Sequence, residues 1–106
     1  MMKSKGLVLV AGAVLSLGMA GSALALDGGA LYKEKNCFTC HGLDAKTPIM
    51  PTYPKLAGQN ADYLHQQILD IKSGARSNAL TAAMKPFVAT ITDEESTAIA
   101  DWLSKQ

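Results

Sequence analysis

Residues 37–41 read Cys37–Phe38–Thr39–Cys40–His41, and the rest of the chain is interpreted around them. On a helical backbone, two cysteines three positions apart and the histidine that follows lie on one face. Two thiols so spaced can add to the two vinyl groups on one edge of a haem, and the imidazole can reach the iron from the same side. The pattern therefore predicts one haem c, attached through Cys37 and Cys40, with His41 as an axial iron ligand.

Three other uses of these cysteines are open at this point. A thioredoxin-like redox pair needs C-x-x-C between a strand and a helix, and this chain shows no strand pattern. A structural zinc site needs four ligands, and only Cys37, Cys40, His41 and His65 are available; Cys40 and His41 are adjacent, which suits a tetrahedron poorly. A disulfide would close a loop too short to stabilise much. Haem attachment is the favoured interpretation.

The first 25 of the 106 residues have the pattern of an export signal. Lys3 and Lys5 make a basic start, an apolar run follows, and Ala23 and Ala25 place small residues where a signal peptidase reads the chain. The uncharged stretch is also about as long as a membrane anchor of ~20 residues, but its last third is poor in strongly apolar side chains. We expect residues 1–25 to be a signal peptide cleaved after Ala25, and the mature protein to be periplasmic.

Residues 26–106 are expected to form one domain with little net charge. They carry eight basic and nine acidic side chains, a net charge of −1. Nucleic-acid binding needs a basic patch, so the composition argues against it. A chain this short buries only a modest core, and small exported domains usually depend on disulfides, a metal or a cofactor. A haem would supply the missing apolar volume.

Apolar spacing predicts an all-α fold with three main helices and long loops, since no segment alternates like a strand. The first helix is expected from near Gly29 to about Lys35, with Asp27 as its cap. The second is expected to begin after Asn60 and to end at Gly74.

The third helix has the clearest signals. Thr92 and Glu95 form a capping box at its start. Four apolar residues then share one face: Ala98, Ile99, Trp102 and Leu103. Prolines make residues 42–59 an irregular loop. Residues 73–83 are small and polar, and the stretch Ala82–Phe87, which contains Pro86, is expected to be non-helical.

The second axial ligand of the iron has three candidates, Met50, Met84 and His65. The number of residues between each candidate and His41 excludes none of them, because an extended chain covers roughly 3.3 Å per residue. Met84 lies in a stretch expected to be a loop, from which a side chain can reach the far face of a haem. Met50 lies between two prolines, and His65 is interpreted as a surface residue. Local context favours Met84, with a vacant position as a further alternative.

Around these residues the sequence resembles the class I c-type cytochromes, in particular small periplasmic cytochromes and the domains of two-haem ones. The matching segments are Ala30–Tyr32, Cys37–Gly42, Tyr53–Gln59, Ala61–Leu64, Lys72–Arg76, Met84 and Thr92–Glu95. The resemblance implies a cytochrome c fold wrapped around one covalent haem. It also implies that Met84 is the second axial ligand and that the Pro54 carbonyl binds the His41 imidazole. A single C-x-x-C-H implies one haem.

Two further sets of contacts are implied by the resemblance. The first and last helices of the family cross, which suggests that Gly29 and Tyr32 meet Trp102. Arg76 or Asn78 is placed to meet a haem propionate.

His/Met ligation leaves no open coordination position, so the sequence predicts a single-electron carrier and not an enzyme. Its partners would be redox proteins, with only transient membrane contact at redox complexes, and Lys46, Lys55 and Lys85 could steer an acidic partner. One alternative is a small haem subunit of a larger periplasmic dehydrogenase or oxidase complex. Another is a haem enzyme or sensor whose sixth position opens.

Overall fold

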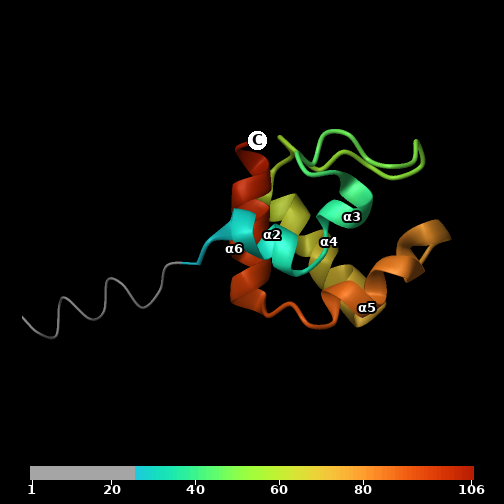
Figure 1. The fold of residues 1–106 in the computed structure, drawn as a ribbon. Coiled ribbons are helices and arrows are strands. Elements are labelled where there is room, and N and C mark those ends of the chain that lie inside the picture. Colours follow the sequence, from blue (N-terminus) through green and yellow to red (C-terminus); the bar gives the residue numbers. More distant parts are fainter. Residues whose placement is uncertain (1–25) are drawn as a thin grey trace, which may run out of the picture.

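The computed structural model describes residues 26–106. Residues 1–25, with the predicted signal peptide and its cleavage site, lie outside the described residues. In chain order the elements are α2 (Gly28–Glu34), α3 (Phe38–His41), α4 (Ala61–Ser73), the 3-10 helix η1 (Ala79–Met84), α5 (Lys85–Val88) and α6 (Asp93–Ser104) (Figure 1). Residues 26–106 contain helices and no strand, which confirms the predicted all-α class. None of these helices is long and apolar enough to cross a membrane.

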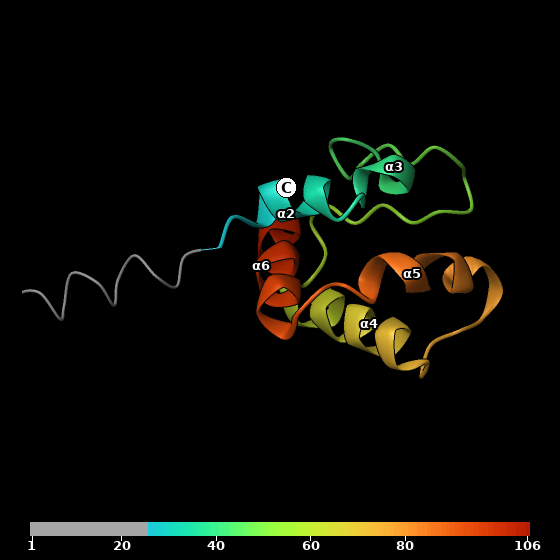
Figure 2. The same ribbon diagram turned by 60° about the horizontal axis from the view of Figure 1, so that its bottom comes forward.

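Helix α2 lies across α6 in both ribbon views (Figures 1 and 2). The Asp27 side chain caps α2 by accepting from the Ala30 N–H. The helices approach closely because Gly28 has no side chain; a Cβ there would overlap the Ala98 carbonyl oxygen and lie 2.6 Å from the Cβ of Trp102. The rings of Tyr32 and Trp102 are 5.2 Å apart, so the expected crossing is confirmed, with Gly28 as its tightest point.

Helix α4 packs against α6 on the other side of the crossing. Asn60 caps it by accepting from two backbone N–H groups, and Gly74, at a φ of 91°, ends it, both as predicted. The buried apolar side chains of these helices and of the segments beside them form one core: Leu31, Tyr32, Ala45, Leu64, Ile71, Val88, Ile91, Ile99, Ala100 and Leu103. The capping box of Thr92 and Glu95 is present at the start of α6.

The segment before α6 is more helical than predicted. Residues 79–84 form η1 and residues 85–88 form α5, whereas we expected residues 82–87 to be non-helical. Pro86 lies in the first turn of α5, where its missing N–H costs no hydrogen bond. Thr81 and Val88 are buried, so packing against the core stabilises turns that the small side chains alone do not encode.

His65 was interpreted as a surface residue, and this is wrong. The side chain is half-buried between α4 and α6, with its Nδ1 atom 2.8 Å from the hydroxyl oxygen of Ser96. Ser96 is 1% exposed. The hydrogen bond between the two groups offsets the cost of burying both.

Candidate haem site

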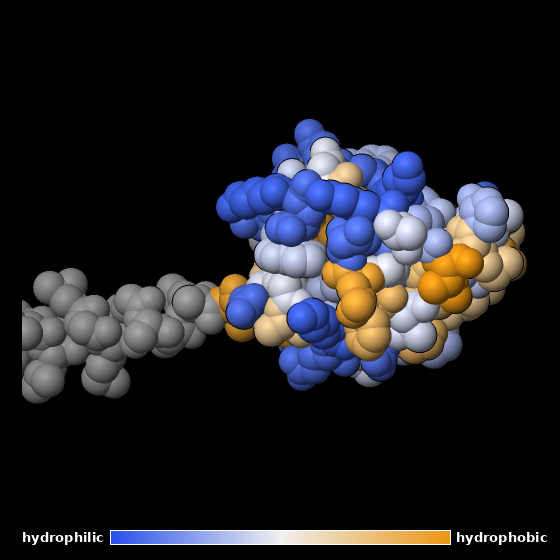
Figure 3. All heavy atoms as spheres, turned by 45° about the horizontal axis from the view of Figure 1, so that its top comes forward, coloured by the Kyte–Doolittle hydropathy of each residue, from blue (hydrophilic) through white to orange (hydrophobic). Residues whose placement is uncertain are grey.

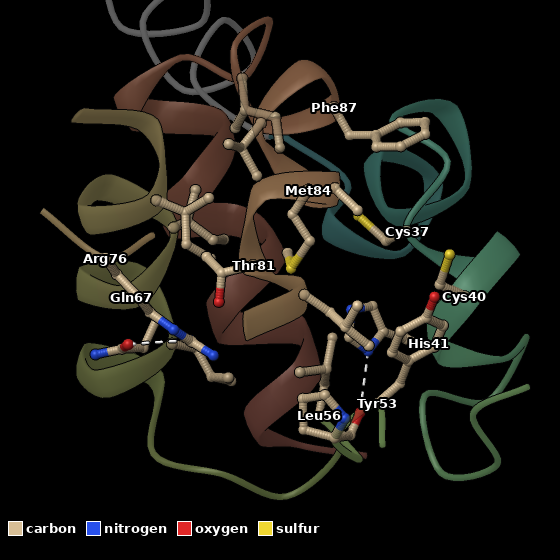
Figure 4. A pocket seen from close by; sticks show the side chains of 18 of the residues that line it. Cys37, Cys40, His41, Tyr53, Leu56, Gln67, Arg76, Thr81, Met84 and Phe87 are labelled. Atoms are coloured by element: carbon tan, nitrogen blue, oxygen red, sulfur yellow. Dashed lines mark hydrogen bonds between the residues drawn. The ribbon is translucent and has the colours of Figure 1, made fainter. Parts of the chain in front are cut away.

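One cavity of about 400 Å³ brings the predicted site residues together. On one side of the cavity lies α3 with the loop that follows it, and on the other side lie the helices α4 and α5. These two sides face each other in Figure 2. Cys37, Cys40, His41 and Met84 all line it (Figure 4). Its volume is within the range of about 300–1,000 Å³ typical of cofactor sites. Most of its wall is apolar, which suits a flat macrocycle.

The attachment segment is helical, as the spacing argument required. Cys37 has φ −59° and ψ −38°, and α3 continues from Phe38 to His41. Figure 4 shows the side chains of Cys37 and Cys40 along one edge of the cavity. Both thiols are free, and burial raises the pKa of Cys37 to about 11. This raised pKa is the opposite of the lowered pKa that a redox-active cysteine has.

His41 is held by the loop that follows its helix. Its side chain is buried, and its Nδ1 atom lies 3.0 Å from the carbonyl oxygen of Pro54, which confirms the contact implied by the resemblance. Burial lowers the pKa of His41, against the opposing effect of the Pro54 carbonyl. Because a carbonyl only accepts, Nδ1 carries the proton and Nε2 keeps its lone pair. A neutral imidazole fixed in this way can act as a metal ligand through Nε2.

Of the three candidates for the second axial position, only Met84 lines the cavity. It is the last residue of η1, and its sulfur points into the cavity (Figure 4). Met50 is 43% exposed and lies outside the lining. His65 also lies outside it and is hydrogen-bonded to Ser96. The fold therefore brings the residues of α3 and η1 to one space and leaves the other two candidates out of it.

Arg76 lies across the cavity from the cysteines (Figure 4). Arg76 and His41 are the only basic side chains in the described lining. The Nη1 atom of Arg76 donates to Oε1 of Gln67 at 3.1 Å. In a haem, the propionates lie on the edge opposite the vinyl groups. A haem attached at Cys37 and Cys40 would have its propionates on the side of Arg76, as the resemblance implies. Asn78 lines the same cavity.

Comparisons with known proteins agree with this geometry. Residues 23–103 match the family described as cytochrome c oxidase, cbb3-type, subunit III. The chain is 37% identical over 93 residues to cytochrome c-553 of Nitratidesulfovibrio vulgaris, and the match covers 88% of each chain. The chain belongs to the class I c-type cytochromes. Membership implies a covalent haem c.

Other relatives of this cytochrome are longer than it is. A thiosulfate dehydrogenase electron acceptor of Stutzerimonas stutzeri is 41% identical over 80 residues, which is 76% of this chain and 36% of that protein. The crystal structure of reduced recombinant cytochrome c4 from Pseudomonas stutzeri matches with a TM-score of 0.65 at 24% identity, over 77% of this chain and 47% of the other. The cytochrome thus spans less than half of these two relatives. The structural match shows the cytochrome c fold.

The donor set fits a haem and does not fit zinc. Within residues 26–106, no group of three His, Cys, Asp or Glu side chains is arranged to hold a metal ion. Haem c needs two thiols, one imidazole and an apolar pocket, and this cytochrome supplies all of them at one cavity. Sequence reasoning missed four polar lining residues: Asn36, Thr52, Gln67 and Thr81. Gln67 follows Leu64 at i+3, so a polar residue on an apolar helix face was the available signal.

Proposed function

We propose that this cytochrome is a periplasmic single-electron carrier whose haem c is held between His41 and Met84. The observation that carries the proposal is that these two side chains, from α3 and η1, point into the same cavity (Figure 4). The basic start, apolar run and small residues of the first 25 positions support export. Cys37 and Cys40 are the attachment residues.

The protein's own groups would make this site a carrier. When bound, the haem iron supplies one-electron chemistry by alternating between two oxidation states. Imidazole and thioether ligands would occupy both axial positions, so no position stays open to a substrate. The His41 Nδ1–H donates to Pro54, which holds the ring in one orientation. Buried Leu64, Ile71 and Ile99 line the cavity and would place apolar surface against the haem.

A second candidate role is that of a small haem subunit in a larger dehydrogenase or oxidase complex. Two comparisons favour it: the match to a family described as an oxidase subunit and the relative named as a thiosulfate dehydrogenase electron acceptor. The native mass after gentle purification separates the two roles. A free carrier elutes as the single chain, and a subunit elutes with its complex.

The partners would be redox proteins that approach the side of the molecule where the cavity lies. Two segments flank the cavity, residues 42–59 and 75–92, and three large apolar side chains of the first are exposed outside the cavity lining: Leu43, Ile49 and Met50. Apolar patches also interrupt the hydrophilic surface on the face drawn in Figure 3. These two segments together carry four basic side chains and one acidic one. An acidic, partly apolar partner is the best match.

The carrier proposal is tested by the spectrum of the oxidised holoprotein at neutral pH. The expected results are a low-spin oxidised spectrum with a sulfur-to-iron charge-transfer band that added cyanide leaves unchanged, and a reduced spectrum that carbon monoxide leaves unchanged, both on the time scale of mixing. A high-spin iron that binds either ligand readily would contradict the proposal and favour a haem enzyme or sensor.

A further inference from the structure

Tyr32 contacts the haem-attachment segment at both of its ends. The Tyr32 backbone carbonyl accepts a hydrogen bond from the N–H of Cys37, at 3.0 Å. Its side-chain hydroxyl donates to the carbonyl of Gly42, the residue directly after His41, at 2.6 Å. One residue of α2 therefore brackets the five residues from Cys37 to His41.

Tyr32 is itself firmly held. It is 0% exposed, and its ring packs on Trp102 of α6 at 5.2 Å. Its neighbours in α2 approach α6 through Gly28, where no Cβ would fit. The position of Tyr32 is therefore set by the crossing of α2 and α6.

Gly42 transmits that position to the histidine. Its N–H donates to the Phe38 carbonyl at 3.0 Å and ends α3. Its φ is 89°, and a Cβ would overlap the Thr47 carbonyl oxygen, so the turn leaves the glycine little room. The carbonyl that receives the Tyr32 hydroxyl also accepts from the N–H of Ala45 at 3.2 Å. Fixing Gly42 thus fixes the backbone on which His41 is carried.

The hydroxyl of Tyr32 acts as a donor throughout the working pH range. Burial, with smaller contributions from Cys37 and Asp44, raises the pKa of Tyr32 well above its ordinary value. His41 then has two separate restraints, one on its ring from Pro54 and one on its backbone from Tyr32.

We propose that Tyr32 is a positioning residue for His41, whose hydroxyl fixes the orientation in which the imidazole meets the haem iron. The proposal rests on the proposed function, because it takes His41 as an iron ligand. Loss of the hydroxyl would leave the helix crossing in place and would loosen only the backbone that carries the histidine. A less firmly held imidazole donates less to the ferric iron, the oxidation state that depends more on that donation.

The test compares three variants of the holoprotein. Tyr32→Phe removes the hydroxyl and keeps the ring against Trp102. We expect it to raise the midpoint potential and to shift the paramagnetically displaced NMR signals of the His41 ring protons. Trp102→Phe keeps an aromatic ring beside Tyr32 and keeps the hydroxyl that binds Gly42, so it should lower the denaturation midpoint and shift both of those readouts less than Tyr32→Phe does. Tyr63→Phe removes a hydroxyl from a residue of α4 that is 53% exposed, and should change nothing.

Two results would overturn the proposal: Tyr32→Phe with wild-type potential and His41 signals, or Trp102→Phe shifting both as much as Tyr32→Phe does. If Tyr32→Phe yields no folded holoprotein, hydrogen exchange of the Tyr32 hydroxyl in the wild-type holoprotein tests the proposal instead. A slowly exchanging Tyr32 hydroxyl proton supports the proposal, and a rapidly exchanging one contradicts it. Absence of displaced His41 signals in the wild type would instead count against the proposed ligation, which separates the two failures.

Discussion

The Nδ1 atom of His41 lies 3.0 Å from the carbonyl oxygen of Pro54. This hydrogen bond joins α3 to the irregular loop of residues 42–59. The loop therefore does more than connect two helices, since it supplies the acceptor that sets which imidazole nitrogen carries the proton. The rigid backbone of a proline-rich segment suits this task.

Replacing both cysteines should remove the haem and much of the fold. Serine hydroxyls do not form thioethers with haem vinyl groups, so Cys37→Ser with Cys40→Ser should yield no covalently bound haem. Without the macrocycle, the cavity of about 400 Å³ leaves the core unfilled. Haem staining after denaturing electrophoresis and far-ultraviolet circular dichroism measure the two effects.

Thr39→Ser is the matched control, because Thr39 is exposed and lies between the cysteines. It should retain haem and helix content. A double serine variant that folds to wild-type helicity without haem would show that the core does not depend on the cofactor.

Gly28→Ala should weaken the crossing of α2 and α6. The new methyl group would overlap the backbone carbonyl of Ala98, which cannot rotate away. Overpacking of this kind costs about 1–3 kcal/mol of unfolding free energy. Denaturant unfolding of the holoprotein measures it.

Gly29→Ala is the comparison for that variant. Its methyl group would meet the end of the Trp102 ring, at 2.8 Å from Nε1, and the ring can shift. Alanine in a helix also gains about 0.5–1 kcal/mol over glycine. The Gly29 variant should therefore lie near wild type in stability. Equal losses in the two variants would contradict the assigned contact.

Glu95→Gln should destabilise the protein at neutral pH and not in acid. The Thr92 N–H, and secondarily Lys35, lower the pKa of Glu95 in the folded state. A lowered pKa contributes stability above the ordinary glutamate pKa, and this contribution is lost as the pH falls through the lowered value. Glutamine keeps an acceptor for Thr92 but loses the charge. Urea unfolding at pH 7 and at about pH 3 should show a difference from wild type only at the higher pH.

Glu94→Gln removes the same charge from the same turn of α6, without the hydrogen bond that Glu95 receives from Thr92. Its effect at pH 7 should be smaller. An equal loss at both pH values in the Glu95 variant would mean that the charge is not what stabilises the cap.

Lys85→Glu should slow electron exchange with an anionic reagent. Lys85 is exposed on α5, directly after Met84. Ferricyanide serves as the probe, and its reaction with the reduced protein should slow as salt screens the local positive charge. The variant should react more slowly at low salt and depend less on salt. Lys105→Glu makes the same charge change after the end of α6. If the two variants change the reaction rate and its salt dependence equally, the result contradicts electrostatic steering by Lys85.

Much of the fold could be predicted because its signals are local. The caps at Asp27 and Asn60 and the box at Thr92 each need only neighbouring backbone groups, and the C-x-x-C-H spacing acts within one helical turn. The contacts that were missed join distant residues. The hydrogen bond from Tyr32 to Gly42 and the one between His65 and Ser96 depend on how helices pack, which periodicity does not report.

The segment before α6 shows the same limit. Residues 79–88 lack an apolar period, and they form η1 and α5 because Thr81 and Val88 are buried against the rest of the chain. For the second iron ligand, the residues alone favoured Met84 and left Met50 and His65 open. Of these three side chains only Met84 lies at the cavity, which supports the proposed ligation.

The most direct test of the central claim is the oxidised spectrum of Met84→Ala beside that of Met50→Ala. If Met84 is the second axial ligand of the iron, its alanine variant should lose the sulfur-to-iron charge-transfer band, and the midpoint potential of that variant should fall. The Met50 variant, altered at a residue 43% exposed and outside the cavity, should keep both. A Met84 variant that retains the band, or a Met50 variant that loses it, would contradict the assignment of this cytochrome as a carrier with His41 and Met84 as ligands.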